Sequence, residues 1–106
     1  MKAASARVVL VTAPRGRKAE ELAKGLVEAR LAACVNVVPD VVSYYRWREK
    51  IHRDPESILV IKTAAGRLPA LKRWIAARHP YSTPEVLAVK GADGSASYLA
   101  WLGAQL

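Results

Sequence analysis

The stretch from Leu31 to Lys50 limits most strongly how this chain can fold, because it predicts one very long and partly apolar strand. At about 3.3 Å per residue, the strand expected over 33–50 would be on the order of 55 to 60 Å long, whereas a compact domain of this size is roughly 35 Å wide. Its far half must therefore project or bend. Exposed strands that carry aromatic side chains aggregate unless something pairs with them. A closed symmetric oligomer is the simplest expectation.

The other elements follow from the spacing of apolar residues. Short apolar runs predict strands, and apolar residues three or four apart predict amphipathic helices. Pro39 cannot donate to a strand ladder, so the long strand should bend or bulge there. The predicted elements are a strand over 7–12, a helix over 17–29, the long strand over 33–50, a polar reversal over 51–56, a strand over 57–63, a helix over 68–79, a strand over 85–90, a turn over 91–95 and a short helix over 98–102.

This order of elements predicts an α+β fold of the ferredoxin-like type, with a β-α-β-β-α-β antiparallel sheet and both helices on one face. The second and third strands form a long hairpin, and a short C-terminal helix follows the sheet. Residues 1–106 fit a single domain. Gly25 lies inside the first helix, where it lowers helix propensity and is expected to allow close packing on the sheet.

Charge and composition narrow the classes of partner. The chain has 17 basic and 9 acidic residues, a net charge of +8, but the basic residues are spread along it without a nucleic-acid-binding module. Nucleic acid is therefore not expected as a partner. No apolar run is long enough to span a bilayer, and no leader-like pattern opens the sequence. These features favour a protein of the cytoplasm with no membrane partner.

Two residues have both a structural and a functional interpretation. Cys34 is the single cysteine, and in an apolar strand it suits a small buried hydrophobe, although a deprotonated thiol would be a soft metal ligand. His79 comes at the expected end of the second long helix, before Pro80, where a helix-capping role would explain it. Its alternative is a metal ligand.

Four segments carry a resemblance that covers nearly the whole chain. They are the long strand 31–50, the segment His79-Pro80-Tyr81-Ser82-Thr83-Pro84-Glu85, the run 11–14 and the run 98–102. Together they resemble the CutA divalent-cation tolerance family. The resemblance implies a ferredoxin-like fold, a homotrimer and a role in tolerance of divalent metals, with copper or another divalent metal as the ligand and no required cofactor.

The resemblance also implies a set of site residues. His79, Glu85 and Cys34 are the candidate metal ligands, since a mixed nitrogen, oxygen and sulfur set suits copper or zinc. Subunit contacts are expected from aromatic residues, whose large buried areas dominate interfaces, together with two basic neighbours. The predicted interface residues are Tyr44, Tyr45, Arg46, Trp47, Lys50, Tyr81 and Trp101.

Two positions depart from the pattern of the family. Where an acidic residue and a glycine usually precede Lys50, this chain has Arg48 and Glu49. The loss of glycine removes easy access to positive φ angles, and Arg48 reverses a charge.

No catalytic constellation emerges, because the chain has no glycine-rich phosphate loop and no nucleophile motif. An enzyme is therefore not expected. The alternative function is that of a trimeric signalling protein resembling the PII proteins, which would bind an anionic metabolite or nucleotide between subunits. In that case Arg46, Lys50, Lys62 and Arg67 would matter most.

Overall fold

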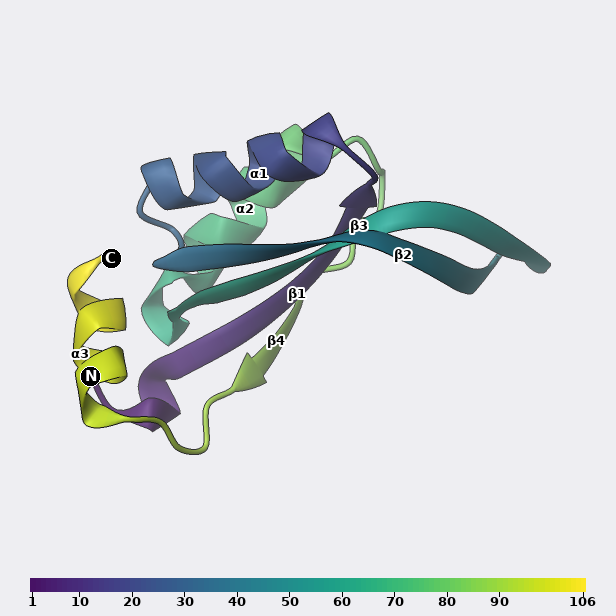
Figure 1. Ribbon diagram of the computed structural model, residues 1–106. Helices are drawn as coiled ribbons and strands as arrows, with labels where there is room; N and C mark the ends of the chain where they lie inside the picture. Colours follow the sequence, from purple (N-terminus) through teal and green to yellow (C-terminus); the bar gives the residue numbers. More distant parts are fainter.

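The computed structural model describes all 106 residues and contains a four-stranded antiparallel sheet with the strand order β2-β3-β1-β4 (Figure 1). Helices α1 and α2 lie together on one face of this sheet, and α3 lies at the end away from the long hairpin. The predicted ferredoxin-like α+β fold is confirmed. The elements are β1 (Ala6–Pro14), α1 (Arg17–Glu28), β2 (Cys34–Trp47), β3 (Lys50–Ala64), α2 (Leu68–Arg78), β4 (Leu87–Lys90) and α3 (Ala96–Ala104), with short 3-10 turns η1 (Ala3–Ser5) and η2 (Ala65–Arg67).

The core lies between the sheet and the two long helices. Every second residue of β1 and β3 points toward the helices, because side chains alternate between the faces of a strand. The buried core side chains include Val9, Val11, Leu59 and Ile61 from the strands, Leu22 and Leu26 from α1, and Leu71 and Ile75 from α2. The helices therefore cover one face of the sheet only.

The opposite face is apolar and largely uncovered, and we call it the open face. Its residues alternate with the core residues along each strand, and the register of β1 with β4 places Leu87 beside Leu10 and Val89 beside Val8. Leu87 and Val89 are 60% and 52% exposed. The apolar residues that β1, β3 and β4 contribute to the open face are Val8, Leu10, Ile58, Val60, Leu87 and Val89.

Beyond Val38 the β2–β3 hairpin continues past the rest of the sheet (Figure 1). We call this part, residues 41–56, the arm. A register shift between Val38 and Val41 marks a bulge at its base, where Ser57 Oγ donates to the Pro39 carbonyl oxygen at 2.8 Å. The predicted irregularity at Pro39 is confirmed. The projecting arm makes the subunit elongated, with extents of 44 × 26 × 24 Å.

The predicted polar reversal over 51–56 is wrong. These residues belong to β3 and pair with β2, as Ile51 does with Arg46 and Pro55 does with Val42. The chain instead reverses at Arg48 and Glu49, whose φ angles of 51° and 66° lie in the left-handed region. Turn residues at Asp54 and Pro55 were misleading because a strand with a neighbour on one side only tolerates proline.

Two further differences concern lengths and packing. The last strand begins at Leu87 rather than at residue 85, and the terminal helix is longer than the predicted 98–102. Gly25 allows close packing as expected, but the neighbour is Trp74 of α2 rather than the sheet. A Cβ atom at Gly25 would lie 2.7 Å from Cζ2 of Trp74.

The strained tip gives a first prediction. Replacing Arg48 by Asn and Glu49 by Gly should stabilise the fold by about 1 kcal/mol or more, because left-handed φ angles are costly for other residues and two-residue hairpin turns favour Asn-Gly. The urea midpoint of unfolding measures this gain. Arg48→Ala is the control, since it keeps a Cβ atom at a positive φ. An unchanged midpoint for the double variant would show that the tip carries no strain.

The helix contact gives a second prediction. Gly25→Ala should destabilise the protein by about 1 to 3 kcal/mol, because the added methyl group overlaps the Trp74 ring and overpacks the contact between α1 and α2. Gly66→Ala is the matched control, since a Cβ atom there meets nothing within 4 Å. Thermal unfolding of both variants tests the contact. Equal melting temperatures for the two variants would argue against it.

Candidate functional site

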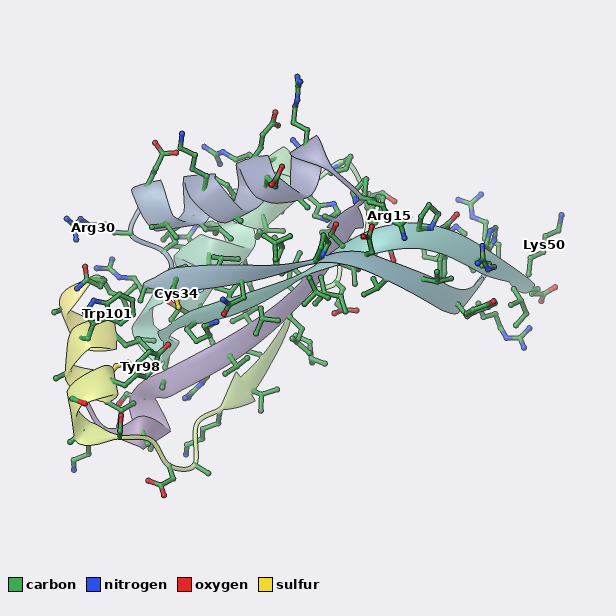
Figure 2. The ribbon with its side chains drawn as sticks, viewed as in Figure 1. Arg15, Arg30, Cys34, Lys50, Tyr98 and Trp101 are labelled. Atoms are coloured by element: carbon green, nitrogen blue, oxygen red, sulfur yellow. The ribbon has the colours of Figure 1, made fainter.

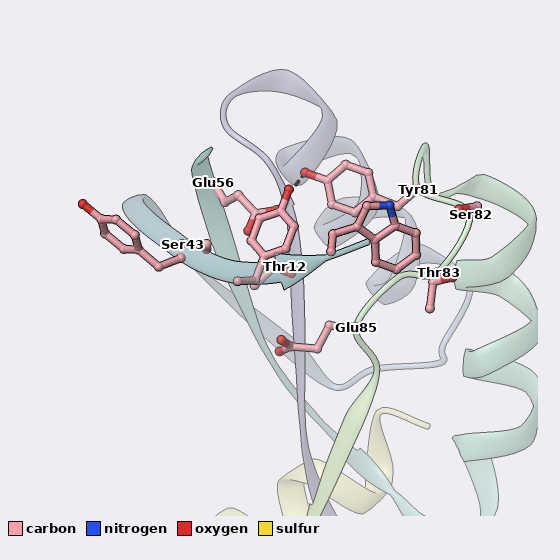
Figure 3. Close-up of a pocket in the computed structure, with 10 residues that line it drawn as sticks. Thr12, Ser43, Glu56, Tyr81, Ser82, Thr83 and Glu85 are labelled. Atoms are coloured by element: carbon pink, nitrogen blue, oxygen red, sulfur yellow. Dashed lines mark hydrogen bonds between the residues drawn. The ribbon is translucent and has the colours of Figure 1, made fainter. Parts of the chain in front are cut away.

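A groove of about 530 Å³ lies at the base of the arm, between β2, β3 and the segment that joins α2 to β4 (Figure 3). Its volume falls in the range of about 300 to 1,000 Å³ that is typical of ligand sites. The lining combines aromatic rings, hydroxyl groups and two carboxylates. The lining residues are Thr12, Ser43, Tyr44, Tyr45, Trp47, Glu56, Tyr81, Ser82, Thr83 and Glu85.

Glu56 and Tyr81 form the polar centre of this groove (Figure 3). Glu56 is only 5% exposed, and its Oε2 accepts a hydrogen bond of 2.7 Å from the Tyr81 hydroxyl. Burial, followed by the hydrogen bond to Glu56, raises the pKa of Tyr81 well above its usual value. Tyr81 therefore keeps its proton and stays the donor, and the carboxylate of Glu56 stays the acceptor.

Asp54 adds another negative charge near the groove. It accepts a hydrogen bond from the Tyr45 hydroxyl, and this bond is the main cause that raises the pKa of Tyr45. His52 stacks against the Tyr45 ring with 5.3 Å between the ring centroids. The arm side of the groove is thus held by contacts between neighbouring side chains of β2 and β3.

His79 holds the loop that carries Tyr81. The ring is 7% exposed, its Nε2 lies 2.8 Å from the Thr12 carbonyl oxygen, and its Nδ1 accepts a 3.1 Å hydrogen bond from the backbone N–H of Tyr81. Because Nδ1 accepts, Nε2 must carry the proton and donate to Thr12. The backbone N–H of His79 also caps α2 by donating to Ile75 at 2.8 Å. Both ring nitrogens of His79 therefore take part in hydrogen bonds that hold the Tyr81 loop next to β1.

Cys34 lies at the opposite end of the open face, beside α3 (Figure 2). Its Sγ is 3.6 Å from the Tyr98 hydroxyl oxygen. Cys34 pairs with Lys62, whereas Thr12, which contacts His79, pairs with Ile58. Since four residues of β3 span about 13 Å, the two ends of the sheet are well separated.

The three predicted metal ligands are therefore not brought together within one subunit. Glu85 lines the groove, His79 lies behind it with both nitrogens occupied, and Cys34 contacts Tyr98. No three His, Cys, Asp or Glu side chains of the subunit are grouped so that they could hold a metal ion. The residues of a single subunit do not fit a resident metal.

The predicted interface residues lie in three places. Tyr44, Tyr45, Trp47 and Tyr81 line the groove. Arg46 and Lys50 are exposed on the arm, with Lys50 at its tip (Figure 2), and Trp101 lies on α3 beside Tyr98. In the single subunit these aromatic side chains are well exposed, from 38% for Tyr81 to 68% for Tyr44. Their role in subunit contacts stays a prediction.

The sequence analysis missed Glu56, the most buried charged side chain of the groove. It lay within the wrongly expected reversal over 51–56, and an acidic residue between Pro55 and Ser57 carries no pattern of its own. Only the pairing of Glu56 with Val41 across the hairpin places it at the base of the arm. Nothing in the sequence signals its contact with Tyr81.

The charge of the groove has the wrong sign for an anionic ligand. Glu56 and Glu85 are its only charged lining residues. None of the four basic residues expected to bind an anion, Arg46, Lys50, Lys62 and Arg67, lines it. A phosphate-bearing metabolite in this groove would face carboxylates without a compensating cation.

Comparisons with known proteins agree on one family. A family model described as "CutA1 divalent ion tolerance protein" matches residues 7–105. "Divalent-cation tolerance protein CutA" of Thermus thermophilus is 47% identical over 90% of this chain and 92% of its own length. Human "Protein CutA" is 41% identical, and the match covers 92% of this chain but only 55% of the human protein. This chain thus spans about half the length of several longer relatives.

Solved structures show the same similarity. CutA1 from Oryza sativa superimposes with a TM-score of 0.93 at 40% identity, over 95% of this chain and 93% of that one. Relatives are named chloroplastic in Arabidopsis thaliana and periplasmic in Archaeoglobus fulgidus, so the cytoplasmic location stays a prediction. No helix here combines the length and apolarity needed to cross a membrane. Because sequence and fold agree over nearly its full length, this chain belongs to the CutA1 divalent ion tolerance protein family.

Proposed function

We propose that this protein is a homotrimer that contributes to divalent-cation tolerance by binding rather than by catalysis. Family membership supports the tolerance role, because the relatives are named as divalent-cation tolerance proteins and not as enzymes. The single observation that carries the assembly is the open face of the sheet together with the arm. Both leave apolar side chains in water in an isolated subunit.

The open face supports self-association through its composition. Six aliphatic side chains from three neighbouring strands lie there, of which Leu87 and Val89 are exposed and the others half-buried, and β4 leaves a free edge beside them. Contiguous apolar patches of more than a few hundred Å² mark interaction surfaces in soluble proteins. Helices already cover the other face, so a further layer must come from outside the subunit.

The arm supports the same assembly. Over residues 50–55 of the arm β3 has β2 as its only neighbour, and the two strands expose Tyr44, Trp47 and Ile51. A two-stranded ribbon is marginal in water by itself, and its free edges invite pairing with other chains. Three copies related by a threefold axis would shelter these edges in a closed ring.

Divalent metal binding, of copper or another ion, belongs to this proposal at or near the subunit interfaces. Metal ligands must then come from more than one subunit, since one subunit offers no set of three. Glu85 is the predicted ligand best placed for this role, because it lines the groove and is exposed. A role for His79 or Cys34 requires the ring to leave Thr12 or the thiol to leave Tyr98.

Sedimentation tests the assembly. We expect the wild type to sediment as a trimer at micromolar concentration, and Trp47→Ala to dissociate at least tenfold more readily, because large aromatic side chains dominate interface energies. Val27→Ala is the control, since Val27 is an exposed apolar side chain of α1, on the other side of the sheet. A monomeric wild type, or a Trp47→Ala trimer as stable as the wild type, would refute the assembly.

Calorimetric titration with copper and zinc tests the metal site. Binding should be present in the trimer and at least tenfold weaker in Glu85→Gln, because the amide removes a charged oxygen ligand. Glu28→Gln removes an exposed carboxylate of α1 and should bind as the wild type does. Adenine nucleotides, titrated in parallel, should not bind. Equal metal binding by the wild type and a dissociated Trp47→Ala subunit would place the site within one chain and contradict the proposal.

A further inference from the structure

The groove is acidic in a chain whose net charge is +8. Its two charged lining residues are Glu56 and Glu85, and Asp54 lies close by on the same face of the arm. The only ion pair of the subunit joins Arg15 to Asp40, at 3.1 Å. No basic side chain of the same subunit therefore forms an ion pair with a carboxylate of the groove.

Of the carboxylates in the groove, Glu56 is the one most affected by the lack of an ion pair. Its side chain is only 5% exposed, and its hydrogen-bond partner is the neutral hydroxyl of Tyr81. Charged side chains are almost never this buried unless they are paired, because the loss of hydration is costly. A cation from outside the subunit would complete the site.

The arm of a second copy offers such a cation. Residues alternate along β2, so Tyr45 and Trp47 face the groove while Arg46 points to the opposite face of the arm. Arg46 is exposed and makes no hydrogen bond or ion pair within its subunit, unlike Arg53, which donates to the Tyr44 hydroxyl at 3.0 Å. Arg46 does not line its own groove, and its guanidinium has no partner within the subunit.

We infer that Arg46 of one subunit enters the groove of the next and pairs with Glu56. This inference rests on the proposed trimer and names a residue that completes its site. The planar guanidinium can bind a carboxylate through two parallel hydrogen bonds and stack on the aromatic walls. Arg46 is not one of the residues that line the groove, so the contact joins two different surfaces and is head-to-tail, which is the kind of contact that closes a threefold ring.

A double-mutant cycle tests the pair. Arg46→Gln and Glu56→Gln should each raise the dissociation constant of the trimer at least tenfold. The dissociation constant of the double variant should be no higher than that of the more affected single variant, because each change already breaks the same contact. Glu56→Gln keeps an oxygen that can accept from Tyr81, so the subunit should fold, as circular dichroism will show. Arg46→Lys should restore part of the stability, and Arg73→Gln, an exposed arginine of α2, should change nothing.

Charge reversal adds a test that depends on the ring. The double variant Arg46→Glu/Glu56→Arg should recover a trimer that each single reversal weakens. A mixture of the two single variants should recover it only in part, because a mixed ring of three restores two contacts and leaves one with like charges. A mixed assembly as stable as that of the double variant would indicate an even-numbered ring and overturn the inference.

The remaining outcomes separate the inference from the proposed function. A wild type that is monomeric at micromolar concentration refutes the trimer itself. A stable wild-type trimer in which the two Gln substitutions act additively, or in which Arg46→Gln has no effect, refutes only the Arg46–Glu56 pair. In that case Glu56 is balanced by another group and the trimer stands.

Discussion

The pairing of β2 with β3 is the interaction on which the rest of the structure depends. These strands have 14 and 15 residues, whereas β1 has 9 and β4 has 4, so the hairpin must run past the sheet that the other strands complete. The arm, the groove at its base and the aromatic side chains without a cover all follow from this mismatch. The bulge at Pro39 shifts the alternation of the long strand by one residue, because Val38 pairs with Ile58 before it and Val41 pairs with Glu56 after it.

The position of the helices has an equally large consequence. With α1 and α2 on one face, the β-α-β-β-α-β order leaves the other face bare, and this chain lines it with aliphatic residues. A small domain cannot fill such a face with its own core. The fold itself thus leaves an apolar face that another subunit would cover. The groove lies where this open face meets the arm.

The contacts of the predicted metal ligands differ from what the name of the family suggests. The name of the family suggests metal binding, yet two of the three predicted ligands, His79 and Cys34, make contacts within the subunit. His79 joins β1 to the loop after α2, and Cys34 contacts Tyr98 of α3. Within one subunit the groove is lined by two carboxylates and no basic side chain.

Much of this architecture was available from the sequence by itself. Apolar periodicity predicted the order of the elements, the missing N–H of Pro39 predicted the bulge, and the length of the second strand predicted an exposed arm, because each depends on local geometry. Two results depended on tertiary structure. The reversal lies at Arg48 and Glu49 rather than at Asp54 and Pro55, because pairing across the hairpin decides the register and outweighs local turn preference. Glu56, Tyr81 and Glu85 meet in one groove while Cys34 lies apart, since contacts between distant segments depend on how strands and loops pack and leave no mark in the sequence.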